Sequence, residues 1–549
     1  MSHSEPASKR RRVTEPNSLQ MYPQELLVYS PESAETFHSP LSSSNSRYYQ
    51  DVFSHNPGYI ASQEELRSML IMTAQSAAPS RRGSPVIGEE IESEETLPRP
   101  GSGANNRWNA RALVTQQVQT TECAHGSEGR RHSHQRATDV SVLGSATGKG
   151  QEPGQGQIMS GWNRRRIQYL KNYVAEVAPW LDMFDAQATF GIQLPALARN
   201  FPALLYAILA ISARQLERKE GMPDSFESLE LYQEAIRLLS PLLQNRDPKV
   251  IGACVLLCCL EMMSARAQDW RRHLEGCAAL FDAFNINGFS QGLLQAIFWC
   301  YARMDLCGAL MSDGTQSTLL QPSKWLPANT REEDVIHMFQ EAESPDMYAN
   351  YAVYLCAKAC ELVSLRTKFL ELGEDNGCTG DIYHQRWLKL WEELQNWLAR
   401  RPREIMPVQT VNSKPFPHIL FVHWAAISSN QLYHTACVLM LNMMPKGAKL
   451  QGNPEITTSL WHARRICGIS VTNPHAGCLN NAIQPLWIAG RLFSHQSEHA
   501  QIISLIRNIE AATGWGACWR IRDLEIAWGY KAHRMDRPER QNQESLTDN

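Results

Sequence analysis

Apolar residues recur every three or four positions through most of residues 161–530, and this spacing predicts helices. In the first of these helices, the repeated apolar positions are Ile167, Leu170, Tyr173, Val174 and Val177. Pro179 ends that pattern, because a proline ring cannot continue a regular helix. No stretch of this region shows the sustained period-two alternation that predicts half-buried strands. The pattern therefore predicts an all-α body over residues 156–530.

Proline, glycine and aspartate mark further helix boundaries within this body. Pro202 suits the first turn of a helix that Gly221 ends, and Asp247-Pro248 has the same form of helix start. The helix after Pro248 reads VIGACVLLCCLEMM and is apolar nearly all round. A helix without a polar face is expected to be central in the core.

The two ends of the chain have a different composition. Residues 1–155 are rich in Ser, Pro, Gly, Gln, Glu and Arg and have few regularly spaced apolar residues. Such a segment cannot bury enough apolar surface to offset the entropy lost on ordering, so we predict a disordered N-terminal region. Gln63–Ala78 is its one expected transient helix. The polar residues 531–549 predict a short disordered tail.

Charge and cysteine content restrict the classes of function. The net charge of -3 predicts no global attraction to nucleic acid. Most of the 14 cysteines lie among apolar residues, which indicates buried free thiols in a reducing compartment. The longest apolar stretches, Phe201–Ile211 and Ile251–Leu260, are shorter than a membrane span, and no secretory signal begins the chain. We therefore expect no membrane partner.

Four ordered blocks of the body carry a resemblance to a known family. They begin LKNYVAEVAPWLDMFD, HLEGCAALF, FVHWAAISSNQLYHTACVLMLNM and QPLWIAGRLFSHQSEHAQIISLIRNIE. Together they resemble the fungal-specific transcription factor domain, which is the regulatory domain of zinc binuclear-cluster activators. The resemblance implies an all-helical regulatory domain in a nuclear protein that modulates transcription by RNA polymerase II.

The zinc module of that family has no counterpart in this sequence. In the family, six cysteines spaced C-x2-C-x6-C twice over hold two zinc ions and place a short helix in the major groove. Here only Cys123 precedes Cys254, and no later pair has C-x2-C spacing. We therefore expect no zinc cofactor, and DNA contact that is indirect or lost. Three explanations remain open: a regulator without the module, a gene model truncated before Met1, or a protein acting through a DNA-binding partner.

Two basic runs are candidates for contact with other molecules. Lys9, Arg10, Arg11 and Arg12 form a compact run of the kind that nuclear import factors recognise. The alternative for this run is a solvated cluster of charge. Arg164–Arg166 begins a helix and is interpreted as a solvated face rather than a binding site. The first run supports an expected location in the nucleus.

Two short patterns match catalytic motifs in unsuitable surroundings. Gly288-Phe289-Ser290-Gln291-Gly292 fits the G-x-S-x-G nucleophile elbow, which requires a preceding strand. Helical spacing precedes it here, so the glycines are predicted to form a turn between helices. His495–His499 fits the H-x-x-E-H zinc motif. Its polar surroundings favour histidines on the exposed start of a helix.

The remaining clusters of metal-binding residue types favour ordinary structural roles. Cys123, His125, His132 and His134 lack the spacing of a structural zinc site. Cys356 and Cys360 lie four positions apart on an apolar helix, where core packing explains them. We therefore predict no catalytic, metal or cofactor-binding residues and no enzyme activity.

Aromatic residues of the body suggest a ligand cavity only at the level of the whole domain. The candidates are Trp299, Tyr301, Trp387, Trp391, Trp397, Trp424 and Trp487. The leading hypothesis is a nuclear transcriptional regulator whose partners are the transcriptional machinery, a DNA-binding protein or a small-molecule effector. The alternative is a small-molecule-binding or scaffold protein with no role at promoters.

Overall fold

A computed structural model describes residues 53–77, 155–222, 226–264, 267–312, 315–341, 344–450 and 457–530. All of these residues belong to one compact unit, Asp51–Asn549, and they are overwhelmingly helical. The all-α prediction is therefore confirmed for the described part of the chain.

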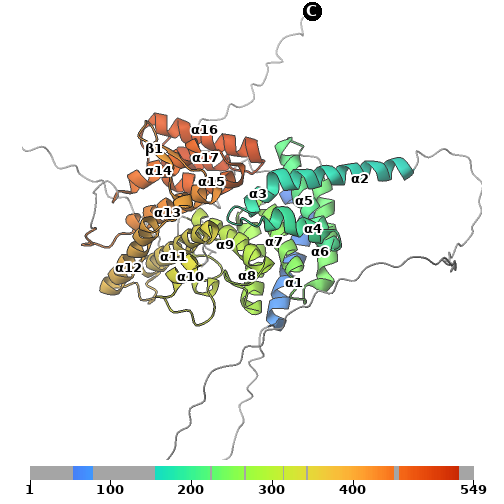
Figure 1. Cartoon of the computed structure of the whole chain (residues 1–549), viewed down its shortest axis with the longest axis horizontal. Coiled ribbons are helices and arrows are strands. Elements are labelled where there is room, and N and C mark those ends of the chain that lie inside the picture. Colours follow the sequence, from blue (N-terminus) through green and yellow to red (C-terminus); the bar gives the residue numbers. More distant parts are fainter. Residues whose placement is uncertain are drawn as a thin grey trace, which may run out of the picture. The chain divides into compact units, whose positions relative to one another are not determined.

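Helices make up most of the described chain (Figure 1). Those of the first half are α1 (Pro57–Ala77), α2 (Gln155–Asn172), α3 (Ala178–Leu181), α4 (Leu194–Ala198), α5 (Pro202–Lys219), α6 (Glu227–Leu239), α7 (Pro248–Ser264) and α8 (Ala267–Phe284). Those of the second half are α9 (Leu293–Met311), α10 (Val335–Glu341), α11 (Pro345–Leu372), α12 (Gly380–Ala399), α13 (Trp424–Asn442), α14 (Ser459–Thr472), α15 (Ala476–Gly490), α16 (Gln496–Thr513) and α17 (Trp519–Ala527).

Shorter elements connect some of these helices. Two are π-helical turns, η4 (Tyr173–Val177) and η5 (Thr189–Gln193). The 3-10 turns are η3 (Phe53–His55), η6 (Ser240–Leu242), η7 (Pro322–Trp325) and η8 (Arg403–Ile405). The strands β1 (Gln409–Val411) and β2 (His418–Leu420) pair antiparallel in a hairpin that the apolar pattern did not predict. At three residues each, these strands are too short to show alternation in the sequence.

The predicted helix boundaries agree with the structure. Pro202 opens α5, where its missing N–H breaks no helical hydrogen bond. Gly221 follows α5 with φ of +66°, a conformation that residues with side chains rarely adopt. Pro248 opens α7, and the Asp247 carboxylate accepts a hydrogen bond from the backbone N–H of Lys249 at 2.9 Å.

Two buried helices organise the packing. Helix α7 is buried from Val250 to Ser264 and contacts α5, α8 and α9, as its uniformly apolar sequence predicts. Helix α13 is buried from Ala425 to Met440 and contacts α11, α14 and α15. Helix α15 also contacts α3 and α9, so it links the two groups. The resulting core is continuous through the described body.

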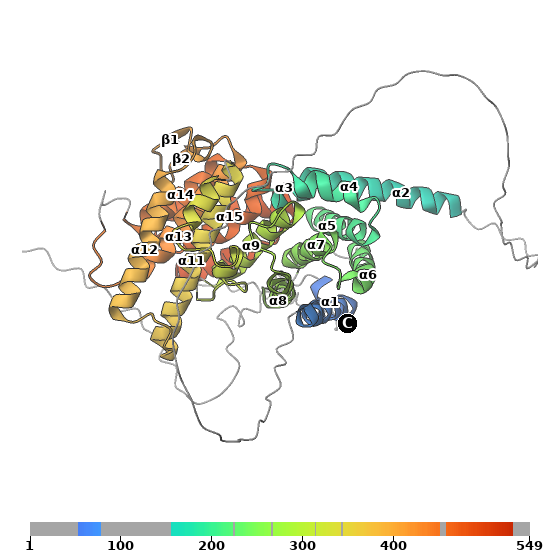
Figure 2. The ribbon, with the colours of Figure 1, turned by 60° about the horizontal axis from the view of Figure 1, so that its bottom comes forward.

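Helix α1 corrects the prediction for the N-terminal region. The segment expected to be a transient helix within a disordered region packs on α8 and α6 (Figure 2). Its residues Tyr59, Leu66, Leu70 and Ala74 are all buried. Gly276 of α8 allows this close approach, since a Cβ at that position would lie 2.9 Å from Leu70 Cβ. The folded body therefore includes a helix that precedes residue 155.

The helix that begins with α2 passes Pro179 by changing its winding. It continues from α2 through the π-helical turn η4 into α3, which has Pro179 in its first turn. The helical pattern was predicted to end at Pro179, and it ends instead at Leu181, the last residue of α3. A π-helical turn shifts the hydrogen-bond register, so the missing N–H of proline falls where a partner is not required. Trp180 and Leu181 follow directly and face the cavity described next.

Candidate functional site

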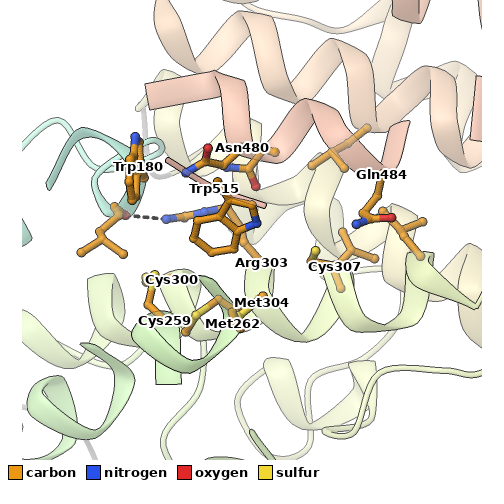
Figure 3. Close-up of a pocket in the computed structure, with 15 residues that line it drawn as sticks. Trp180, Cys259, Met262, Cys300, Arg303, Met304, Cys307, Asn480, Gln484 and Trp515 are labelled. Atoms are coloured by element: carbon orange, nitrogen blue, oxygen red, sulfur yellow. Dashed lines mark hydrogen bonds between the residues drawn. The ribbon is translucent and has the colours of Figure 1, made fainter. Parts of the chain in front are cut away.

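A cavity of about 70 Å³ lies between α3, α7, α9, α13 and α15, beside Trp515. Its floor consists of sulfur-bearing side chains from α7 and α9, namely Cys259, Met262, Cys300, Met304 and Cys307. Figure 3 shows these side chains on one side of the cavity and Trp180, Asn480 and Trp515 on the other. The volume is enough for several waters or a small organic molecule.

Arg303 is the one cationic side chain in the lining of this cavity, and it is 6% exposed. One guanidinium nitrogen, Nη2, donates a hydrogen bond to the carbonyl oxygen of Leu181, drawn as the dashed line in Figure 3. The guanidinium also lies over the Phe184 ring, 5.4 Å from its centre. Burial lowers the pKa of Arg303, and the nearby carboxylates of Asp182 and Asp185 oppose this change. Within the described residues, no carboxylate lies within 4.0 Å of this guanidinium.

The carboxylate of Asp182 is held by backbone N–H groups rather than by Arg303. Its oxygens accept hydrogen bonds from the backbone N–H groups of Phe190 and Gly191, each at 2.7 Å. Burial raises the pKa of Asp182 to about 7, although these two hydrogen bonds lower it. The carboxylate thus anchors the start of η5 and compensates the charge of Arg303 only from a distance.

Amide side chains of α15 supply the other polar groups of the cavity. The Asn480 amide has both its nitrogen and its oxygen buried without a hydrogen-bond partner in the described residues. Gln484, one turn further along, accepts a hydrogen bond from Arg520 at 2.7 Å. A buried amide without hydrogen-bond partners is rare and costs stability. The two amide atoms of Asn480 are therefore the groups of this cavity that a polar ligand would stabilise most.

A second polar cluster lies under α1, around Glu261 of α7. Its carboxylate accepts hydrogen bonds from Tyr232 Oη at 2.7 Å, from His273 Nδ1 at 2.6 Å and from Gln63 Nε2. Burial lowers the pKa of His273, but the charges and hydrogen bonds of Glu261 and Cys277 together raise it more, to about 10. Glu261 and His273 have no exposed side-chain surface. With no surface open to a substrate, the cluster fixes α1, α6, α7 and α8 together.

The G-x-S-x-G segment forms the turn between α8 and α9, as predicted. Ser290 Oγ accepts a hydrogen bond from the backbone N–H of Asn287 at 3.0 Å. Gly288 lies against the Trp299 ring, where a Cβ would approach to 2.5 Å. A helix rather than a strand precedes the serine, so the geometry of a nucleophile elbow is missing at this turn.

The two histidines of the H-x-x-E-H segment have separate roles. His495 is the exposed N-cap of α16, and its ring accepts a hydrogen bond from the backbone N–H of Ser497. His499 is buried, stacks on Trp528 with ring centres 3.8 Å apart, and bonds to Tyr530 Oη at 2.8 Å. The expectation of two exposed histidines is therefore wrong for His499. Across the described residues, no three His, Cys, Asp or Glu side chains form a metal-binding group.

The remaining candidates lie in the core, at the surface or outside the described residues. Cys356 and Cys360 are fully buried on α11. Of the seven aromatic candidates, Trp424 is 37% exposed and the rest are buried, and none lines this cavity, whose aromatic residues are Trp180 and Trp515. The residues outside the described ranges are Lys9, Arg10, Arg11, Arg12, Cys123, His125, His132 and His134.

Sequence reasoning missed the cavity because its lining comes from segments far apart in the chain. One signal was present: Arg303 is a charged residue in the apolar stretch LLQAIFWCYARMDLCGALM. Buried arginines require specific partners, so its position could have indicated a polar site. Asn480 and Trp515 carried no such signal.

The body matches the family model of the fungal-specific transcription factor domain over residues 168–528. The match includes the helices from α3 to α17, and the chain therefore belongs to this family. It is also similar to a protein named transcription activator AMTR1 from Alternaria alternata, with 21% identity over 428 residues. That alignment covers 67% of this chain and 52% of the relative, so the chain spans about half of the relative's length. No solved structure matches.

The family is one of transcription factors, and the domain that this chain shares with it is all-α in the described residues apart from one short hairpin. Every described helix falls short of what a bilayer crossing needs, either in length or in apolar character. The family is a family of transcription factors and not of enzymes.

Proposed function

We propose that this chain regulates transcription by RNA polymerase II in the nucleus, through its helical domain. The observation that supports this most strongly is the family match over residues 168–528, which coincides with the helical body. The relative named as a transcription activator agrees with a role at promoters. The Lys9–Arg12 run supplies the chemistry for nuclear import.

DNA contact in this proposal is indirect, through a DNA-binding partner protein or the transcriptional machinery. A single cysteine precedes Cys254, so residues in front of the body do not supply the six thiolates of a binuclear zinc cluster. The net charge of -3 gives no general attraction to phosphates. The helical body would therefore act as the interaction surface, and an effector in the cavity would favour one arrangement of its helices.

Fluorescent tagging of the whole chain tests the location. The intact protein is expected in the nucleus, and alanine replacement of Lys9, Arg10, Arg11 and Arg12 is expected to move most of it to the cytoplasm. The control replaces Arg81 and Arg82, a shorter basic pair, and should leave nuclear accumulation unchanged. Cytoplasmic residence of the intact protein would contradict the proposal and favour the small-molecule-binding or scaffold alternative, for which the cavity is the supporting observation.

A reporter assay tests the role in transcription separately from the mode of DNA contact. The whole chain is fused to an unrelated DNA-binding module and directed to a promoter that carries its site. A change in reporter output that also requires residues 161–530 supports the proposal. Sequence-specific, salt-resistant binding of the purified, unfused chain to DNA would contradict indirect contact.

A further inference from the structure

We propose that the cavity between α3, α9 and α15 binds a small organic anion: a carboxylate on a compact apolar body, held by Arg303 and Asn480. The inference deepens the proposed function, because it names the chemical class of effector that the regulatory domain would detect. Three features of the cavity support it.

Arg303 presents an incompletely paired cation to the cavity. Of its donors, Nη2 bonds to the Leu181 carbonyl oxygen, which carries no formal charge. The acidic groups near the Arg303 guanidinium are held by backbone N–H groups: Asp182 accepts from Phe190 and Gly191, and Asp185 accepts from Gln187 and Thr189. One oxygen of Asp346 accepts from the backbone N–H of Ala186 at 3.1 Å, and its other oxygen has no partner in the described residues. Burial also raises the pKa of Asp346, and it raises the pKa of Asp182 to about 7, so the negative charge of Asp182 is incomplete near neutral pH. A carboxylate in the cavity would complete the pairing of this guanidinium.

Asn480 supplies a donor and an acceptor without partners at the same cavity. Its amide nitrogen can donate to a carboxylate oxygen, and its amide oxygen can accept from a hydroxyl group or a water beside that carboxylate. Asn480, Arg303 and Trp515 line the same cavity (Figure 3). An entirely apolar ligand would leave both amide atoms unsatisfied, and an organic cation would be repelled by Arg303.

The rest of the lining suits a compact apolar body. Met262 and Met304 are flexible and polarizable, and they face Trp180 and Trp515 across the cavity (Figure 3). Cys307, Asn481 and Trp515 are partly exposed, so the lining of the cavity includes residues that solvent reaches. The volume of about 70 Å³ limits the ligand to roughly the size of one small ring or short branched chain.

The test uses the purified whole chain and three probes of matched size: benzoate, the neutral benzamide and the cationic benzylammonium. Saturation-transfer NMR and the thermal unfolding midpoint report binding at probe concentrations up to about 10 mM, where weak fragments are detected. Benzoate is expected to bind and raise the midpoint, with benzamide weaker by about tenfold and benzylammonium without effect. Equal binding of all three probes, or binding of none, would overturn the proposal.

Two cavity variants and one control locate the binding. Arg303→Met is expected to weaken benzoate binding about tenfold or more and to leave benzamide binding nearly unchanged. The control is Arg401→Met, which removes an arginine bonded to the Leu398 carbonyl and stacked over Trp397, away from the cavity. It should leave benzoate binding intact.

Asn480→Leu keeps the test decisive if the Arg303 variant fails to fold. This change removes two unpartnered polar atoms, so the ligand-free midpoint should rise while the benzoate-dependent increase shrinks. Benzoate binding that is unchanged in Asn480→Leu would place the probe elsewhere and reject the site. These measurements are independent of location and reporter output, so a failure here is distinguishable from a failure of the proposed function.

Discussion

At the scale of single residues, two charged side chains inside apolar helices, Glu261 and Arg303, are stabilised by specific partners from other helices. Glu261 is the only charged residue in the buried part of α7, and it receives hydrogen bonds from α1, α6 and α8. In α9, Arg303 and Asp305 are both buried, and the Arg303 guanidinium bonds to a backbone carbonyl and lies over an aromatic ring. Glu261 and Arg303 both join helices that are distant in sequence.

Replacing Glu261 with leucine should destabilise the protein strongly. The change leaves the donors of Tyr232, His273 and Gln63 buried without an acceptor, at an expected cost of about 3–5 kcal/mol. The matched control is Glu275→Leu on α8, whose carboxylate is 48% exposed and lies 3.6 Å from Arg67. Loss of that exposed ion pair should lower the free energy of unfolding by about 1 kcal/mol or less. Urea unfolding measures both, and equal costs would contradict a special role for the buried cluster.

Asp182 gives the stability of the protein a specific pH dependence. Burial raises its pKa in the folded state to about 7, above its ordinary value of 3.8. Its contribution to stability is therefore fully present below pH 3.8 and is lost as the pH rises through 7. In Asp182→Asn this contribution disappears. The difference between the thermal unfolding midpoints, wild type minus variant, should therefore decrease as the pH is raised from 4 to 7.5.

Thermal unfolding across this pH range measures the difference directly. An Asp375→Asn variant at an exposed loop position serves as the control for general charge effects. Parallel curves for the wild type and Asp182→Asn would show that Asp182 titrates normally in the folded protein.

At the scale of helices and turns, local sequence predicted the elements whose boundaries have chemical markers. Pro202, Gly221 and Pro248 each mark a boundary by a backbone property that does not depend on the rest of the fold. The turn at Gly288 was predicted for the same reason. The stability of helix α1 was underestimated, because it comes from packing on α6 and α8, and no local sequence pattern reveals that packing.

Local sequence reveals even less about the cavity, because tertiary packing alone brings its residues together. Trp180, Arg303 and Asn480 come together through the packing of α3, α9 and α15, and none of the three belongs to a short motif. The π-helical turn before Pro179 also positions Trp180 and could not be read from helical periodicity. Sites that are built from distant segments require the tertiary fold before they can be located.

Replacing Gly276 with alanine should loosen the packing of α1 on α8. Alanine favours helices over glycine by about 1 kcal/mol, but its Cβ would lie 2.9 Å from Leu70 Cβ, and such overpacking costs about 1–3 kcal/mol. We therefore expect faster amide hydrogen exchange in Pro57–Ala77. Combining Gly276→Ala with Leu70→Ala should cost less than the sum of the single changes, because the shorter side chain makes room. Additive costs would contradict a direct contact.

At the scale of the whole molecule, α1 (Pro57–Ala77) packs on the helical body although it precedes residue 155. A chain that begins at residue 155 has lost Gln63 from the Glu261 cluster and the apolar cover of α8. Conversely, residues 1–50 contain none of the described elements, which begin at Phe53. Helix α1 is thus a packed element that lies outside the 156–530 range expected from composition.

Two truncations test these limits. Deleting residues 1–154 should lower the unfolding midpoint and increase binding of the dye ANS, because fully burying a large apolar side chain contributes about 1.5–3 kcal/mol and Tyr59, Leu66 and Leu70 are all buried. Deleting residues 1–50 should change neither property. Identical midpoints for the two truncated proteins would show that α1 contributes little.

The contact between Gln63 and Glu261 joins residues that are 198 positions apart, and this separation affects synthesis on the ribosome. At about 5–20 residues per second, α1 emerges roughly 10–40 s before α7 does. During that interval, the side chains of Tyr59, Leu66 and Leu70 have no surface on which to pack. Nascent chains of this protein should therefore engage chaperones that shield apolar segments until α8 has left the exit tunnel.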